Sequence, residues 1–97
     1  MKINEIKLEG YKSAVKRGHY KEKPSEEWIQ YYLSCIGDEV SEARDAIYKR
    51  VITEEKDSLP SELADIVIHV CSLSEYLGID LEKQIAWKMD YNEKRKD

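Results

Sequence analysis

Two short acidic motifs, Glu39-Val-Ser-Glu42 and Glu62-Leu-Ala-Asp65, organise this chain of 97 residues. In each motif the two carboxylates are three residues apart, which places both on one face of a helix. If the two helices form an antiparallel hairpin, the four carboxylates face one small volume, where they repel one another and need cations. Hard oxygen ligands of this kind select Mg²⁺ or, alternatively, Mn²⁺.

The rest of the chain predicts an all-α fold, because apolar residues recur at helical spacing and no alternating strand pattern is found. The hairpin is expected to be the core, with one helix before it and one after it. The expected helices run from about Asn4 to His19, from Ser25 to about Val51, from Ser58 or Ser61 to Leu77, and from Asp80 to Lys94-Arg95-Lys96. The expected N-caps of these helices are Asn4, Ser25, Ser58 or Ser61, and Asp80. The turn of the hairpin is expected at Thr53 to Ser58, and the third helix is expected to end at Gly78.

The length is that of one small domain, residues 1–97. Such a domain buries only about 60–65% of its unfolded surface. The apolar stripes on the expected helices are also broader than a single hairpin can cover. We therefore expect a four-helix bundle completed by oligomerisation, as a homodimer or homotetramer, with active sites near or across a subunit interface.

Composition argues against several classes of partner. The net charge of −4 disfavours a nucleic-acid polymer. No apolar run approaches the roughly 18–20 residues of a membrane span, and Met1-Lys2-Ile3 does not open a signal peptide. Cys35 and Cys71 lie in apolar helical stretches and are expected to be reduced, which favours a cytoplasmic location. The chain has seven tyrosines and no phenylalanine, a bias that the sequence does not explain.

Side chains placed at about 100° per residue set the acids at the edge of the packed seam, not on the outer face. A partly buried carboxylate is costly unless it is paired or bound to a metal. The third expected helix has no lysine or arginine between Ser58 and Leu77 that could neutralise its acids. Ordinary surface acids are the alternative interpretation, and a di-iron bundle is disfavoured because no Glu-x-x-His motif occurs. The stripes that border the seam are Glu62, Asp65, His69 and Tyr76 on one helix and Trp28, Cys35, Glu39 and Glu42 on the other.

At these residues the chain resembles the all-α nucleoside triphosphate pyrophosphohydrolases of the MazG-like family. The family pattern is Glu-x-x-Glu, a loop, then Glu-x-x-Asp, and it matches Glu39, Glu42, Glu62 and Asp65. The stretch Lys88-Met89-Asp90-Tyr91-Asn92-Glu93-Lys94-Arg95 resembles the Lys-Met-Asp-x-Asn-x-x-Arg ending of the dCTP-pyrophosphatase-like branch. The similarity covers about residues 25–95.

The resemblance implies that the four acids bind Mg²⁺ and carry catalysis. Family members cleave a nucleoside triphosphate, NTP or dNTP, between its α and β phosphates to give a monophosphate and pyrophosphate. Divalent ions between the carboxylates and the triphosphate would neutralise both and lower the pKa of a bound water. The expected role is the cleaning of nucleotide pools, with the base and the sugar left open.

Further residues are candidates for substrate binding. Lys88 and Asn92 share a helix face and could reach the polyphosphate, and Arg95 follows on nearly the same stripe. His69 is a packing residue, a base contact or a metal ligand, and Trp28 either packs or stacks on a base. The dCTP-like branch has a tyrosine at the position of His69, and a tryptophan where this chain has Tyr48 and Lys49, so the choice of base stays open. His19 is expected to be exposed at a helix end.

Two alternatives to the pyrophosphohydrolase remain. One is a non-catalytic helical module, which would serve in oligomerisation or as a nucleotide-binding regulator. The other is a phosphoribosyl-ATP pyrophosphohydrolase, against which the Lys-Met-Asp-Tyr-Asn ending argues.

Overall fold

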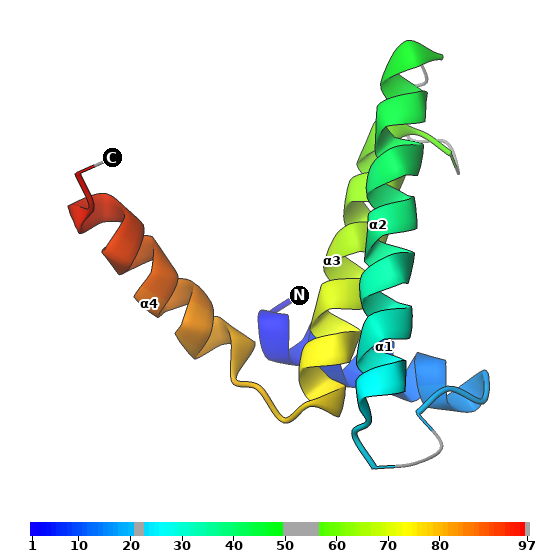
Figure 1. Cartoon of the computed structure of the whole chain (residues 1–97), viewed down its shortest axis with the longest axis horizontal. Helices are drawn as coiled ribbons and strands as arrows, with labels where there is room; N and C mark the ends of the chain where they lie inside the picture. The colour runs from blue at the N-terminus through cyan, green and yellow to red at the C-terminus, as the bar shows by residue number, and fades with distance from the viewer. Residues whose placement is uncertain (21–22, 50–56, 97) are drawn as a thin grey trace.

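The computed structural model describes residues 1–20, 23–49 and 57–96, and within these ranges the regular structure is entirely α-helical (Figure 1). The helices are α1 (Ile3–Lys16), α2 (Glu26–Tyr48), α3 (Leu59–Tyr76) and α4 (Leu81–Lys94). The predicted all-α fold is confirmed. Most of the turn expected at Thr53 to Ser58, and the expected end of the second helix at Val51, lie outside the described residues.

The predicted helix ends are largely confirmed, with α1 as the exception. Its N-cap is Lys2 and not Asn4, which is already helical, and the helix ends at Lys16 before reaching His19. At the end of α3, Gly78 adopts a φ of +69°, a left-handed conformation that glycine accepts without steric cost. The confirmed side-chain caps accept backbone N–H groups as follows: Ser25 from Trp28 at 3.3 Å, Ser58 from Ser61 at 3.3 Å, and Asp80 from Lys83 at 3.1 Å.

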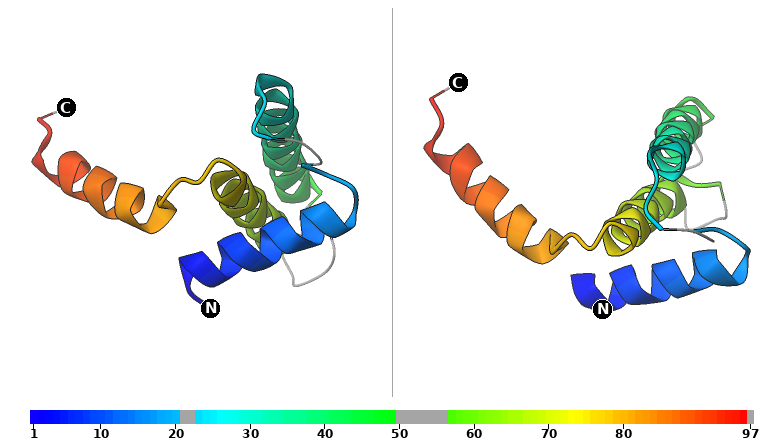
Figure 2. Two further views of the ribbon diagram at one scale, coloured as in Figure 1. Left: turned by 90° about the horizontal axis from the view of Figure 1, so that it is seen from below. Right: turned by 60° about the horizontal axis from the view of Figure 1, so that its bottom comes forward.

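The two long helices α2 and α3 lie side by side as the expected antiparallel hairpin, and α1 crosses α3 (Figures 1 and 2). The crossing is close at Gly10, where an added Cβ would lie 3.5 Å from the Ile68 carbonyl oxygen and 3.5 Å from the Ser72 Cβ. Gly10 weakens α1 intrinsically, but it lets α1 approach α3 closely. As a result, α1 packs across one end of the hairpin (Figure 1).

The core at this end explains part of the tyrosine bias. Tyr20 is buried and stacks on Tyr32 and Tyr76, with ring centroids 4.6 Å and 4.1 Å away. The Tyr76 hydroxyl accepts a hydrogen bond from the Ser25 backbone N–H at 3.0 Å and donates one to the Lys23 carbonyl at 3.1 Å. Phenylalanine could fill the same volume but could not make these bonds. The tyrosines therefore join the segment between α1 and α2 to α3.

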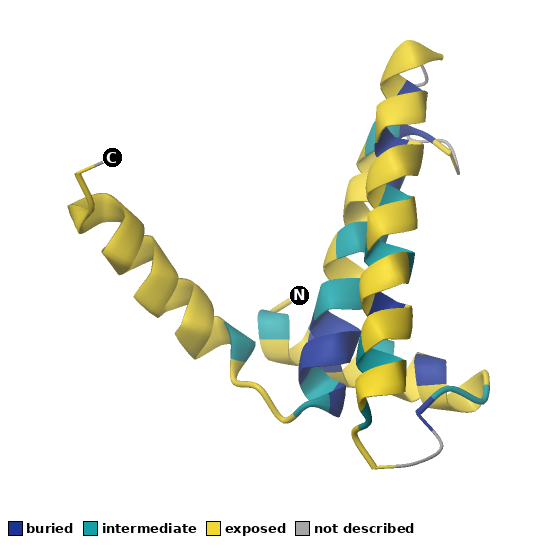
Figure 3. Cartoon of the chain, viewed as in Figure 1, coloured by how far each residue is buried: buried dark blue, intermediate teal, exposed yellow. Residues whose placement is uncertain are grey.

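The last helix, α4, diverges from the hairpin and approaches α1 only near its start (Figures 1 and 2). No residue of α4 is buried, and large apolar side chains along it are exposed (Figure 3). They are Ile85, Trp87, Met89 and Tyr91. Among the described residues, no helix combines the length and the apolar character that a membrane crossing would need.

Candidate metal centre

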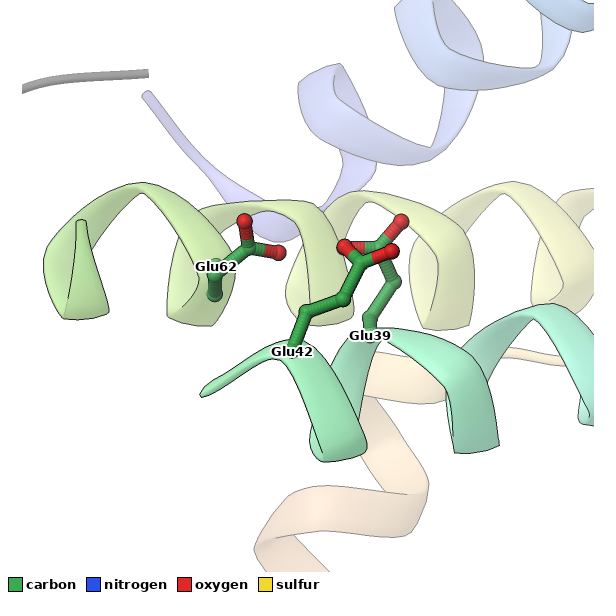
Figure 4. Close-up of side chains that lie close together, drawn as sticks. All are labelled: Glu39, Glu42 and Glu62. Atoms are coloured by element: carbon green, nitrogen blue, oxygen red, sulfur yellow. The ribbon is translucent and has the colours of Figure 1, made fainter. Parts of the chain in front are cut away.

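Three glutamates converge between the two hairpin helices (Figure 4). Glu39 and Glu42 extend from α2 and Glu62 from α3, and each offers an oxygen within 4.8 Å of the others. Glu62 is only 3% exposed, Glu39 is half-buried and Glu42 is exposed. The carboxylates therefore form a cluster that opens to solvent on the side of Glu42.

The environment disfavours negative charge on all three glutamates. Burial is the main cause of the raised pKa of Glu39, and the charges of Glu42 and Asp65 raise it further. Hydrogen bonding to Glu62, then burial, raise the pKa of Glu42. Hydrogen bonding to Glu39, then burial, raise the pKa of Glu62. Clustered carboxylates cannot all ionise cheaply unless a cation joins them.

The described residues provide no such cation. The ion pairs found among them join Lys7 to Glu75 and Lys94 to Asp90, outside the cluster. One oxygen of Glu39 and one of Glu62 are buried without a hydrogen-bond partner among residues 1–20, 23–49 and 57–96. Buried polar atoms in this state are uncommon and costly, and an ion is one of the ordinary explanations. The donor set, all carboxylate oxygen, fits a hard divalent cation such as Mg²⁺.

Asp65, the fourth predicted acid, lies beside this group. It is half-buried on α3, and its charge raises the pKa of Glu39 and of Glu62. Its oxygens do not fall within the mutual 4.8 Å spacing that joins the three glutamates. The structure therefore brings together three of the four predicted acids and leaves Asp65 at their edge.

His69 and Trp28 lie in an aromatic cluster centred on Tyr32. The His69 ring is 6.1 Å from that of Tyr32, and its Nδ1 is buried without a partner among the described residues. Trp28 is half-buried, and its ring lies 6.2 Å from that of Tyr32 and 5.6 Å from that of Tyr31.

His19 also belongs to this cluster, so the expectation that it is exposed was wrong. It is half-buried, and its Nδ1 is hydrogen-bonded to the Tyr32 hydroxyl. Burial, followed by the charges of Arg17 and His69, lowers its pKa. No local sequence signal marks this role, because His19 follows the end of α1 and is brought to α2 by the path of the chain.

Lys88, Asn92 and Arg95 lie on or at the end of α4, which diverges from the acids (Figure 1). All three are exposed. The Lys88 ammonium lies over the Tyr91 ring, 4.7 Å from its centroid. Within one chain the structure does not bring these side chains to the carboxylates.

The fold and the site thus define an all-α protein whose helical hairpin gathers carboxylates, with no counter-cation beside them among the described residues. The family model described as MazG nucleotide pyrophosphohydrolase domain matches residues 28–97, more than half of the chain, and the protein belongs to this family. The match spans all four predicted acids and α4. No curated protein and no solved structure matches the chain significantly.

Proposed function

We propose that the protein is a Mg²⁺-dependent nucleoside triphosphate pyrophosphohydrolase that converts an NTP or dNTP to the monophosphate and pyrophosphate, in the cleaning of nucleotide pools. The observation that carries the proposal is the pair of buried oxygens on Glu39 and Glu62 that have no hydrogen-bond partner in the part of the chain that the structure describes, with Glu42 completing the group. The family match supports a nucleotide substrate.

The carboxylates would hold the ion, and Asp65 would complete the set from the edge of the group. A bound divalent ion would neutralise the carboxylates and the triphosphate and lower the pKa of a bound water. Without it, four carboxylates would repel a triphosphate. By analogy with the family, one of the carboxylates, with Glu39 as the candidate, would also accept the proton of the attacking water.

The aromatic cluster is the candidate site for the nucleobase. His69 follows Asp65 by one helical turn, so a base held there would lie beside the acids. Trp28 and Tyr31 provide partly exposed ring surface on which a base could stack. His69 Nδ1 is a hydrogen-bonding atom with no partner among the described residues.

The phosphate donors would come from a second copy of the chain. At 100° per residue, Lys88 and Asn92 lie on α4 between Trp87 and Tyr91 on one side and Ile85 and Met89 on the other. This arc is apolar and basic, whereas the acid cluster lacks cations among the described residues. The two surfaces are complementary in charge. A homodimer, or a tetramer of dimers, would place α4 of one subunit near the acids of the other.

The first experiment titrates Mg²⁺ while thermal unfolding is recorded. The wild-type melting temperature should rise with Mg²⁺, because an ion that binds only the folded state stabilises it. The rise should disappear in Glu62→Gln and persist in Asp45→Asn, which alters an exposed acid on α2.

A product assay completes the test. The wild type should release pyrophosphate from some member of a broad NTP and dNTP panel with Mg²⁺ or Mn²⁺. Asp65→Asn should lose this activity by about a hundredfold or more without loss of helicity. No turnover of any nucleotide, together with no effect of Mg²⁺ on the melting temperature, would instead identify a non-catalytic helical module.

A further inference from the structure

The most unusual lysine of the described chain is Lys7 on α1, which is only 7% exposed. Buried lysines are rare unless their ammonium group is paired. The Lys7 ammonium donates a hydrogen bond to the Ile79 carbonyl at 2.6 Å and lies 3.8 Å from a Glu75 carboxylate oxygen. Its principal partner is therefore a backbone atom of the connection between α3 and α4.

In that connection, Ile79 is hydrogen-bonded both to α3 and to α1. Its N–H donates to the Ser74 carbonyl at 2.9 Å, and the Gly78 N–H donates to the Glu75 carbonyl at 3.1 Å. These bonds form the paired closing pattern of a helix that ends on a left-handed glycine. The Ile79 N–H thus belongs to the end of α3, while its carbonyl is held by Lys7 on α1.

The helix α4 starts directly after this anchored residue. Asp80 is its N-cap, and Leu81 is its first residue. Within one chain every residue of α4 from 82 to 94 is exposed, so side-chain burial inside the chain does little to fix its direction. A cavity of about 470 Å³ lies between α1 and the connection that precedes α4, so side-chain packing is sparse where α4 begins.

We infer that Lys7 is a positioning residue that sets the orientation of α4 relative to the body formed by α1, α2 and α3. This inference rests on the proposed function where it concerns catalysis, because α4 carries Lys88 and Asn92. A change at Lys7 would misplace these donors without altering the carboxylates, which lie on α2 and α3.

The test compares Lys7→Met, which keeps the length of the side chain but removes the donor, with Lys7→Arg, which retains one. Lys12→Met is the matched control, because Lys12 is an exposed lysine on the same helix. Residual dipolar couplings on α2, α3 and α4 report the orientation of α4, and amide hydrogen exchange reports its protection. Far-UV circular dichroism verifies that each variant is folded.

In Lys7→Met, α4 should change its average orientation relative to the hairpin, and its first-turn amides should exchange about tenfold faster, in line with the loss of a charged hydrogen bond. Lys7→Arg and Lys12→Met should resemble the wild type. Unchanged orientation and exchange in Lys7→Met would overturn the inference, whatever the activity.

The kinetic arm separates this inference from the proposed function. In Lys7→Met the KM for the triphosphate should rise about tenfold with a smaller change in kcat, and the Mg²⁺-induced rise in melting temperature should be retained. If α4 reorients while KM is unchanged, the positioning role of Lys7 stands and the assignment of phosphate binding to α4 is wrong.

Discussion

At the scale of single residues, the protein concentrates negative charge where water is scarce. Glu62 is almost completely buried, and both it and Glu39 carry an oxygen without a partner among the described residues. The raised pKa values of these carboxyls express the same cost. When the pKa of a carboxyl is higher in the folded protein than in the unfolded chain, the free energy of unfolding decreases as that carboxyl ionises.

This cost predicts a pH dependence. Between the ordinary glutamate value of 4.5 and the raised value, the folded state binds more protons at Glu39 and Glu62 than the unfolded state does. The cluster's contribution to stability is therefore fully present below 4.5 and is lost as the pH rises through the raised pKa. Without divalent ions, the melting temperature of the wild type should fall over this range more than that of Glu62→Gln.

Glu93→Gln is the control for the pH profile, because Glu93 is exposed on α4. Its melting profile should follow that of the wild type. Without divalent ions, the melting temperature should fall more steeply with pH in the wild type than in Glu62→Gln. Saturating Mg²⁺ should remove most of this difference in slope. Parallel wild-type and Glu62→Gln profiles without Mg²⁺ would contradict the electrostatic account of the cluster.

At the scale of the helices, caps and close crossings decide where each element lies. Ser25, Ser58 and Asp80 each accept a backbone N–H at the start of a helix, as the sequence predicts. Gly10 is unfavourable for the helix itself, because glycine has a low helix propensity. It is favourable for packing, because the missing side chain lets α1 cross α3 closely. The space around it is limited but not closed.

The crossing predicts opposite effects for two substitutions of Gly10. A methyl group would make ordinary contacts at 3.5 Å, so Gly10→Ala should stabilise the protein by up to about 1 kcal/mol through helix propensity. Gly10→Leu would force α1 away from Ile68 and Ser72 and should destabilise by about 1–3 kcal/mol. Urea denaturation measures both, and a stabilised leucine variant would show that α1 does not cross α3 so closely.

At the scale of the whole molecule, one chain leaves much apolar surface uncovered. Ile47 is 57% exposed on α2, Leu63 is 52% exposed on α3, and Met89 is 67% exposed on α4. The broad stripes that suggest oligomerisation from the sequence are thus only partly covered within one chain. The proposed second copy would cover them and bring basic residues to the acids.

This arrangement predicts that assembly and activity are lost together. The double substitution Ile85→Glu with Met89→Glu places charge on one apolar side of the arc of α4 that carries Lys88 and Asn92, and it should weaken self-association by about a hundredfold or more. Analytical ultracentrifugation should then show monomers where the wild type forms dimers or tetramers, and pyrophosphate release should fall. The matched control Ala86→Glu introduces the same charge at an exposed position on the face of α4 away from this arc, and it should assemble normally. A fully active monomeric double variant would refute a site shared between subunits.

Much of the fold and part of the site follow from local sequence. Helical periodicity and capping residues identify the four helices, and the acidic motifs identify Glu39, Glu42 and Glu62 as neighbours. The N-cap at Lys2 was missed, because Asn4 carries the stronger capping signal but lies inside the helix. The partly buried position of His19 was missed as well, since it depends on a segment that folds back on α2.

The sequence by itself determined the four helices, the helix ends marked by Ser25, Ser58, Gly78 and Asp80, and the face on which each acidic pair lies. These features follow from the period of the helix and from hydrogen bonds within a few residues. Only the tertiary structure decided that Asp65 stands at the edge of the carboxylate group, that the tyrosines bind the segment between α1 and α2 to α3, and that Lys7 holds the start of α4. These features depend on contacts between residues distant in the sequence, whose geometry is set by how the helices cross.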